Sequence, residues 1–107
     1  MVTMGWNVSH DTNQHGEFRR SYTSMSNLAQ QLAHVLTASD WRSIAYLFNR
    51  PSGDPFTVDP AEAGRVAQVL HTAATHQLMP GDWGATANEL ADAADRAAAA
   101  GQPWEWR

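Results

Sequence analysis

Residues 57–79, TVDPAEAGRVAQVLHTAATHQLM, constrain the fold most, because their apolar side chains recur at the spacing of an α-helix. Asp59 can cap this helix, Pro60 takes the first helical position, and Glu62 can bond back to the backbone N–H of Asp59. A Pro-Gly pair follows the stretch and ends it. The apolar face consists of Ala63, Val66, Ala67, Leu70, Ala74 and Leu78. We predict that this helix lies at the centre of the core.

Three short stretches alternate apolar and polar residues, as strands with one buried face do. Residues 4–10 and 17–23 predict the two strands of an N-terminal hairpin, joined by a loop rich in turn residues. Residues 103–107, PWEWR, predict a third strand with both tryptophans on one face. We expect this last strand to pair with the first and to close the sheet. Phe56 and Val58 indicate a brief edge strand before the long helix.

Three further segments have helical periodicity. The first begins at a cap provided by Ser24 or Ser26, the second follows a break at residues 37–40, and the third runs from Asp82 to a stop at Gly101. Their apolar positions are Leu28, Leu32, Val35 and Leu36 in the first, Trp41, Ile44, Ala45, Leu47 and Phe48 in the second, and Trp83, Ala87, Leu90, Ala91, Ala94 and Ala98 in the third.

Together these segments predict an α+β fold in a single domain over residues 1–107. A small antiparallel sheet, made of the N-terminal hairpin and the C-terminal strand, packs against three to four helices. A chain of this length buries roughly 65% of its unfolded surface, which is enough for one core without metal or disulfide. We expect Trp41 and at least one of Trp104 and Trp106 to be part of that core.

Composition excludes several classes of function. The chain has no cysteine and no lysine, so disulfides, thiolate nucleophiles and Schiff-base chemistry are not available to it. The net charge of −4 argues against a general nucleic-acid-binding protein, which would carry a basic face. No apolar run is long enough to span a membrane, and the N-terminus lacks the pattern of a secretory signal. These features together predict a cytoplasmic protein.

The histidines are the first candidates for a binding site. His10, Asp11 and His15 lie in or beside the hairpin turn, where imidazoles and a carboxylate can hold a divalent metal. Their spacing matches no established zinc pattern, so ordinary turn residues are the favoured interpretation. His71 and His76 are five residues apart on the long helix and point about 140° away from each other, so they cannot chelate one ion as a pair.

The arginines provide the remaining candidates. The loop RPSGDPF contains Arg50, which can hold a carboxylate or phosphate, or can pair with Asp54 in a rigid connection. Arg19 and Arg20 are expected on opposite faces of the second strand, where an arginine serves a partner surface or opposes aggregation at an edge. The sequence contains no nucleophile-elbow motif, and it predicts no catalytic residues, no metal site and no cofactor. The candidate ligand- or partner-binding residues are His10, His15, Arg19, Arg50 and Asp54.

Three segments carry a resemblance to a known group of proteins. MGWNVSH at 4–10, RPSGDPF at 50–56 and DWGATANELADAADRAAAAGQPWEW at 82–106 resemble short, functionally uncharacterised proteins of Streptomyces and related actinobacteria. More loosely, the two ends of the chain resemble those of small bacterial and phage hypothetical proteins. The resemblance implies an actinobacterial or phage origin in the cytosol, with a natural start at Met4. It implies no activity, cofactor or catalytic residue.

Two functions remain from the sequence. The first is a non-enzymatic interaction or regulatory protein that binds a partner protein or itself, suggested by the small size, the acidic charge, the aromatic residues and the lack of a catalytic set. The alternative is a small-molecule or metal-binding protein, with enzymatic activity left open, that uses His10, His15 or Arg50 near an aromatic pocket. Nucleic-acid binding ranks third because of the charge.

Overall fold

The computed structural model describes residues 5–10, 13–49 and 55–106, and within the first two strands it describes the side chains of Val8, Phe18, Arg20 and Ser21. The elements in chain order are β1 (Gly5–His10), β2 (Asn13–Ser21), α1 (Tyr22–Val35), α2 (Ala38–Ile44), the short 3₁₀-helix η1 (Ala45–Leu47), β3 (Phe56–Val58), α3 (Pro60–Ala74), α4 (Gly81–Ala100) and β4 (Trp104–Trp106). This is the α+β architecture that the sequence predicts.

The four strands form one antiparallel sheet in the order β2-β1-β4-β3. The N-terminal hairpin pairs Val8 with Phe18, and β4 then adds to the free side of β1, with Val8 opposite Trp106. The predicted closing of the sheet by the last strand is therefore confirmed. The brief strand before the long helix also forms, and it pairs with β4 so that Val58 lies opposite Trp104.

One face of the sheet is buried in the core. Val8, Phe18, Val58, Trp104 and Trp106 are each at most 4% exposed. Thr57 and Glu105, which alternate with these residues in β3 and β4, are more exposed. The buried tryptophans pack edge to face, with ring centroids 5.3 Å apart. Trp104 and Trp106 both belong to the core, as predicted for at least one of them, whereas Trp41 stacks on Phe48 and is partly buried, packed against the core.

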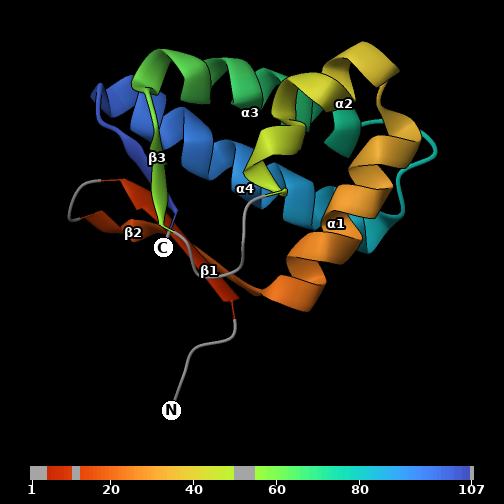
Figure 1. Ribbon diagram of the computed structural model, residues 1–107, viewed down its shortest axis with the longest axis horizontal. Coiled ribbons are helices and arrows are strands. Elements are labelled where there is room, and N and C mark those ends of the chain that lie inside the picture. Colours follow the sequence, from red (N-terminus) through yellow and green to blue (C-terminus); the bar gives the residue numbers. More distant parts are fainter. Residues whose placement is uncertain (1–4, 11–12, 50–54, 107) are drawn as a thin grey trace.

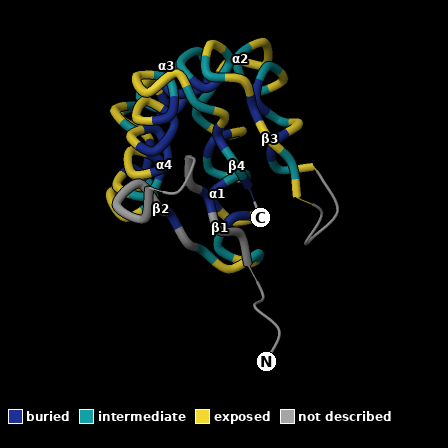
Figure 2. Tube along the Cα trace, turned by 90° about the vertical axis from the view of Figure 1, so that its left-hand side faces the viewer, coloured by how far each residue is buried: buried dark blue, intermediate teal, exposed yellow. Residues whose placement is uncertain are grey.

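The helices cover this face in layers. Figure 1 shows α4 running between α3 and the sheet. α4 contacts β1, β2 and β4 as well as α1, whereas its contact with α3 is the most extensive in the described part of the chain. Figure 2 shows the buried residues on the inner sides of α3 and α4, with exposed residues on their outer turns. The central helix of the fold is therefore α4, and the prediction that residues 57–79 form it is wrong.

The prediction for α3 is right at the start, where Asp59 precedes Pro60 at the first helical position, and wrong at the C-terminal end. Ala63, Val66, Ala67 and Leu70 are fully buried, as the periodicity indicates. The helix ends at Ala74, however, and residues 75–79 turn away from its axis. Leu78 therefore leaves the helical phase and is 63% exposed, while Met79 takes the buried position.

The helix starts depend on short polar side chains. Ser21 accepts a hydrogen bond from the Ser24 N–H and begins α1 two residues before the predicted end of the second strand. Thr37 caps α2 in the same way, within the predicted break. Asp59 precedes α3, but its side chain makes no capping bond, and Glu62 bonds Arg65 instead of the Asp59 backbone.

Two positions, one in α4 and one directly after it, require glycine because of the backbone conformation or a close backbone neighbour. Gly101 adopts the left-handed conformation, with φ of 66°, that ends the helix and directs the chain into β4. Gly84 lies where α4 approaches the end of α3, and a Cβ there would be 3.0 Å from the carbonyl oxygen of Ala74. Side chains larger than hydrogen at Gly84 would push the two helices apart.

Leu70→Ala should lower the free energy of unfolding by roughly 2–5 kcal/mol, because the Leu70 side chain is completely buried. Leu78→Ala is the matched control, since the same atoms are removed at a position that is 63% exposed. That change should cost less than about 0.5 kcal/mol, and His76→Ala should likewise cost far less than Leu70→Ala. Urea denaturation measures all three. Equal costs for the two leucines would contradict the buried face assigned to α3.

Removal of residues 103–107 should destabilise the whole fold cooperatively by several kcal/mol, because it takes away the strand between β1 and β3 and two buried tryptophans. Thermal melting of the shortened chain measures the loss. Iodide quenching of tryptophan fluorescence in the intact chain provides the control, since Trp104 and Trp106 should be protected. An unchanged melting temperature with strong quenching of these two residues would show instead that the tail is a docking peptide.

Candidate functional site

The structure places three of the five predicted site residues in the sheet. His10 lies in β1 at a register position opposite Asn13 and Trp104, Arg19 lies in β2 opposite Asn7, and His15 lies within β2. The side chains of these three residues lie outside the described part of the structure. Arg50 and Asp54 also lie outside the described residues, so the proposed role of their loop stays a prediction.

The described part of the chain contains a polar cluster around His71 that was not predicted. The imidazole Nε2 of His71 lies 2.9 Å from the Asp95 Oδ2 and 3.7 Å from the Asp92 Oδ1. On the other side of the ring, Nδ1 lies 2.8 Å from the Asn88 Oδ1. One histidine of α3 is thus held by three polar side chains of α4, and both ring nitrogens have partners.

The close packing of α3 and α4 positions this cluster. Small residues at the interface let the two backbones come near each other: a Cβ at Gly64 of α3 would lie 3.5 Å from the Cβ of Ala98 of α4, and a Cβ at Gly84 of α4 would lie 3.0 Å from the carbonyl oxygen of Ala74. His71 lies next to the fully buried Leu70 and is itself only partly buried. Its ring therefore meets the polar face of α4 at the rim of the interface.

The electrostatics of the cluster favour a charged imidazole in the absence of any ligand. The hydrogen bond to Asp95 raises the pKa of His71 above its usual value, and Asn88 and the charge of Asp92 act in the same direction against partial desolvation. Protonated, His71 forms ion pairs across the two helices. Neutral, it offers a lone pair to the space shared with the two carboxylates.

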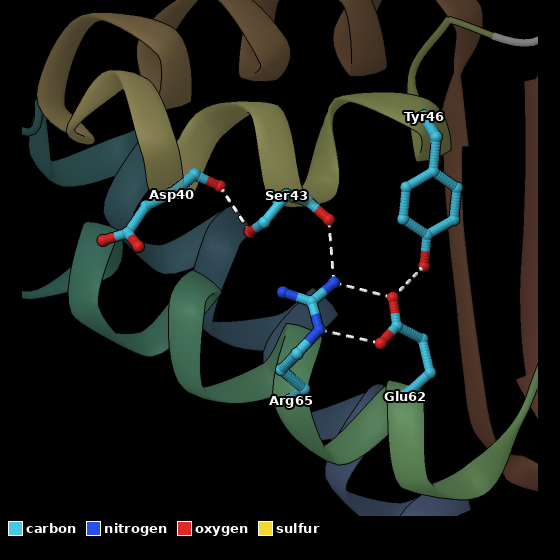
Figure 3. A network of polar contacts seen from close by, with 5 residues as sticks. All are labelled: Asp40, Ser43, Tyr46, Glu62 and Arg65. Carbon is cyan, nitrogen blue, oxygen red and sulfur yellow. Dashed lines mark hydrogen bonds and ion pairs between the residues drawn. The ribbon is translucent and has the colours of Figure 1, made fainter.

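A second polar network joins α2, η1 and α3 (Figure 3). Arg65 forms a bidentate ion pair with Glu62: its Nε donates to Oε1 at 2.7 Å and its Nη2 donates to Oε2 at 2.6 Å. The same guanidinium donates to the carbonyl oxygen of Ser43 at 2.7 Å, and the Tyr46 hydroxyl donates to Glu62 at 2.7 Å. This network fixes the end of α2 and the η1 turn against α3.

The pKa values in this network follow from its hydrogen bonds. The bonds from Arg65 lower the pKa of Glu62, and the carboxylate in turn raises the pKa of Arg65. Partial burial and the hydrogen bond to Glu62 raise the pKa of the Tyr46 phenol well above its usual value. A phenol that stays protonated and an arginine that stays charged are suited to holding structure together and not to transferring protons near neutral pH.

A third feature is the open edge of the sheet at β2. This strand has nine residues and pairs only with β1, so no strand of the described chain covers its outer side. The opposite edge is β3, which has three residues. Arg20 of β2 bonds Glu89 of α4, which anchors the strand to the helix layer, and the same guanidinium lies over the Phe18 ring of its own strand at 4.7 Å.

The sequence contains a pattern that indicates half of the His71 cluster, but it is missed when each helix is considered alone. Asn88, Asp92 and Asp95 are spaced by four and three residues, so they share one face of α4. The partner that makes this face a cluster is on another helix. His71 and His76 make separate contacts, as predicted, but for another reason: α3 ends at Ala74, so His76 lies beyond the helix, where its Nδ1 accepts the backbone N–H of Leu78.

Glu62→Gln should lower stability at neutral pH, because it removes the charge that Arg65 and Tyr46 bind. The pKa of Glu62 is lowered on folding, so its contribution is present above the usual glutamate pKa and is lost as the pH falls through the lowered value. Urea denaturation of both proteins across this acidic range should show the difference shrinking with falling pH. Tyr46→Phe keeps the pair of Glu62 and Arg65. The difference in free energy of unfolding between this variant and the wild type should therefore depend much less on pH. A difference that persists unchanged in acid would refute this role of the charge.

In the described segments, none of the helices combines the length and apolar character that crossing a bilayer requires.

Comparison with known proteins identifies the family of the chain but no activity. The search of curated proteins and the search of solved structures give no match. Residues 11–107 match a family described as a domain of unknown function, DUF7739. The match covers most of the chain, and the protein therefore belongs to the DUF7739 family.

Proposed function

We propose that this protein is a non-enzymatic interaction module that binds a second copy of itself through the outer edge of β2. The observation that carries the proposal is the open edge of this nine-residue strand. An unpaired edge presents a row of backbone N–H and C=O groups that can pair with another strand. The other edge strand, β3, has only three residues and offers far fewer such groups.

A second copy fits this edge because of the symmetry of β2. Two antiparallel β2 strands can be related by a two-fold axis perpendicular to the sheet, which keeps the helix-covered faces of both copies on the same side. Residues on one face then pair only with residues on the same face of the other copy. With Phe18 of both copies at the axis, Glu17 of each lies opposite Arg19 of the other.

Charge selects this register over its neighbours. Moving the axis by one residue in one direction puts Glu17 opposite its own copy, and moving it in the other direction does the same for Arg19. Opposite charges directly across an antiparallel pair stabilise it by a few tenths to about 1 kcal/mol, and like charges destabilise it. The sequence of the strand therefore matches itself in one arrangement, and Arg19, a predicted partner-binding residue, lies at its centre.

The compartment and origin of the module are proposed from the sequence. The absence of cysteine fits a reducing compartment, and we place the protein in the cytoplasm. The actinobacterial or phage origin implied by the resembling segments is proposed on the same footing. Regulation through reversible self-association is the role that suits a small module of this kind.

The test is a charge exchange at the β2 edge. Analytical ultracentrifugation over a range of protein concentrations should show the wild-type protein shifting from monomer to dimer. Arg19→Glu places like charges opposite each other and should shift the equilibrium to monomer, and Glu17→Arg should do the same. The double variant exchanges the two charges, restores the complementary pairs and should dimerise again.

Arg42→Glu is the matched control, because it reverses an exposed charge on α2 away from the sheet edge. It should leave the dimer unchanged. Circular dichroism confirms that each variant is folded. A wild-type protein that stays monomeric at every concentration would overturn the proposal, as would single variants that dimerise as well as the wild type.

A further inference from the structure

We propose that His71, Asp92 and Asp95 form a binding site for one divalent transition-metal ion. The three side chains offer one imidazole nitrogen and two carboxylate oxygens, and these ligand atoms all lie within 4.8 Å of one another. This site is separate from the β2 edge and involves none of the residues that the sequence singled out as ligands.

The distances are close to those that a metal requires. Ligand atoms about 2.1 Å from a tetrahedral ion are about 3.4 Å apart from each other. The two observed separations from the His71 Nε2, 2.9 Å to Asp95 and 3.7 Å to Asp92, lie on either side of this value. The departures from this value are well under 1 Å, so the proposal requires only small rotations of the two exposed carboxylates.

The imidazole is oriented from outside the ligand set. Asn88 places its Oδ1 2.8 Å from the Nδ1 of His71, where an amide oxygen accepts a hydrogen bond from a ring N–H. With the proton on Nδ1, the lone pair of Nε2 points toward the two carboxylates. Metal-binding histidines in proteins are held in this way, by an oxygen acceptor on the nitrogen that does not touch the ion.

The backbone also arranges the carboxylates for a shared ion. Asp92 and Asp95 are three residues apart on α4, so their side chains lie on one face, and Asn88 is one turn before Asp92. Two carboxylates on one face repel each other unless a cation lies between them. The His71 cation has this role in the metal-free protein, and a divalent ion would take it over with twice the charge.

The donor set indicates the class of metal. One nitrogen and two carboxylate oxygens suit Zn²⁺ or Mn²⁺ better than Mg²⁺, which prefers oxygen ligands alone, and better than soft ions that need sulfur. The side chains of Asp92 and Asp95 are 55% and 53% exposed, so water can fill the remaining coordination positions. Three protein ligands with open positions resemble a site for ion binding or exchange more than a closed structural site.

Isothermal titration calorimetry of the full chain with Zn²⁺ and with Mn²⁺ tests the proposal, at a pH above the raised pKa of His71 so that the imidazole is neutral. One ion per chain should bind to the wild-type protein. His71→Ala and Asp95→Asn should each weaken binding at least tenfold, and Asn88→Ala should weaken it to a smaller extent. Asp95→Asn keeps the shape of the side chain and decides the question if the alanine variant fails to fold.

His76→Ala is the control. This histidine is only five residues from His71 in the sequence, but in the described structure its side chain bonds the backbone of Leu78 and takes no part in the cluster. It should bind the ion with unchanged affinity. Changes caused by diamagnetic Zn²⁺ in the ring NMR signals of His71, and not in those of His76, would locate the ion independently. Equal affinity of the wild type, His71→Ala and Asp95→Asn would place any bound ion at other histidines and overturn the proposal, as would the absence of binding to the wild type.

Discussion

Trp104 and Trp106 lie on a three-residue strand that has a hydrogen-bonded neighbour on each side, and the rest of the sheet depends on this position. β4 joins β1 to β3, which are separated along the chain by two helices and a long connection. Both indoles are completely buried, and Trp106 also contacts Phe48 and Phe56 through their rings. The last strand therefore ties the N-terminal hairpin, the η1 region and the β3 edge to one core.

A second constraint, the close approach of α3 and α4, decides where polar chemistry can occur. Alanine and glycine at the interface bring the helices together, and polar side chains at its rim come within bonding distance across the gap. His71 meets Asn88 and Asp95 for this reason. The network of Arg65 and Glu62 arises in the same way on another side of α3, where α2 and η1 pack against it.

The two networks differ in whether their carboxylates are still able to bind a further ligand. In the Arg65 network the carboxylate of Glu62 accepts three hydrogen bonds from two residues, and the pKa values of the members are moved away from neutrality, which suits a structural link. In the His71 cluster two half-exposed carboxylates share one imidazole, so a cation has room to enter. The open β2 edge is separate from both networks, because neither of them includes a residue of β2. A protein that both self-associates and binds an ion would use separate surfaces for each.

The sequence by itself determined the elements and much of their order. Period-two alternation located the hairpin and the tryptophan strand, helical periodicity located the buried face of α3 from Ala63 to Leu70, and Gly101 marked the end of α4. These features are local, since they depend on backbone geometry and on one buried face. Tertiary structure decided which helix is central, because long periodicity in α3 does not reveal that α4 contacts the sheet. Tertiary structure also decided that Leu78 is exposed and that His71 meets Asp92 and Asp95. Both depend on contacts between residues far apart in the chain, and the distance along the chain does not predict the distance in space.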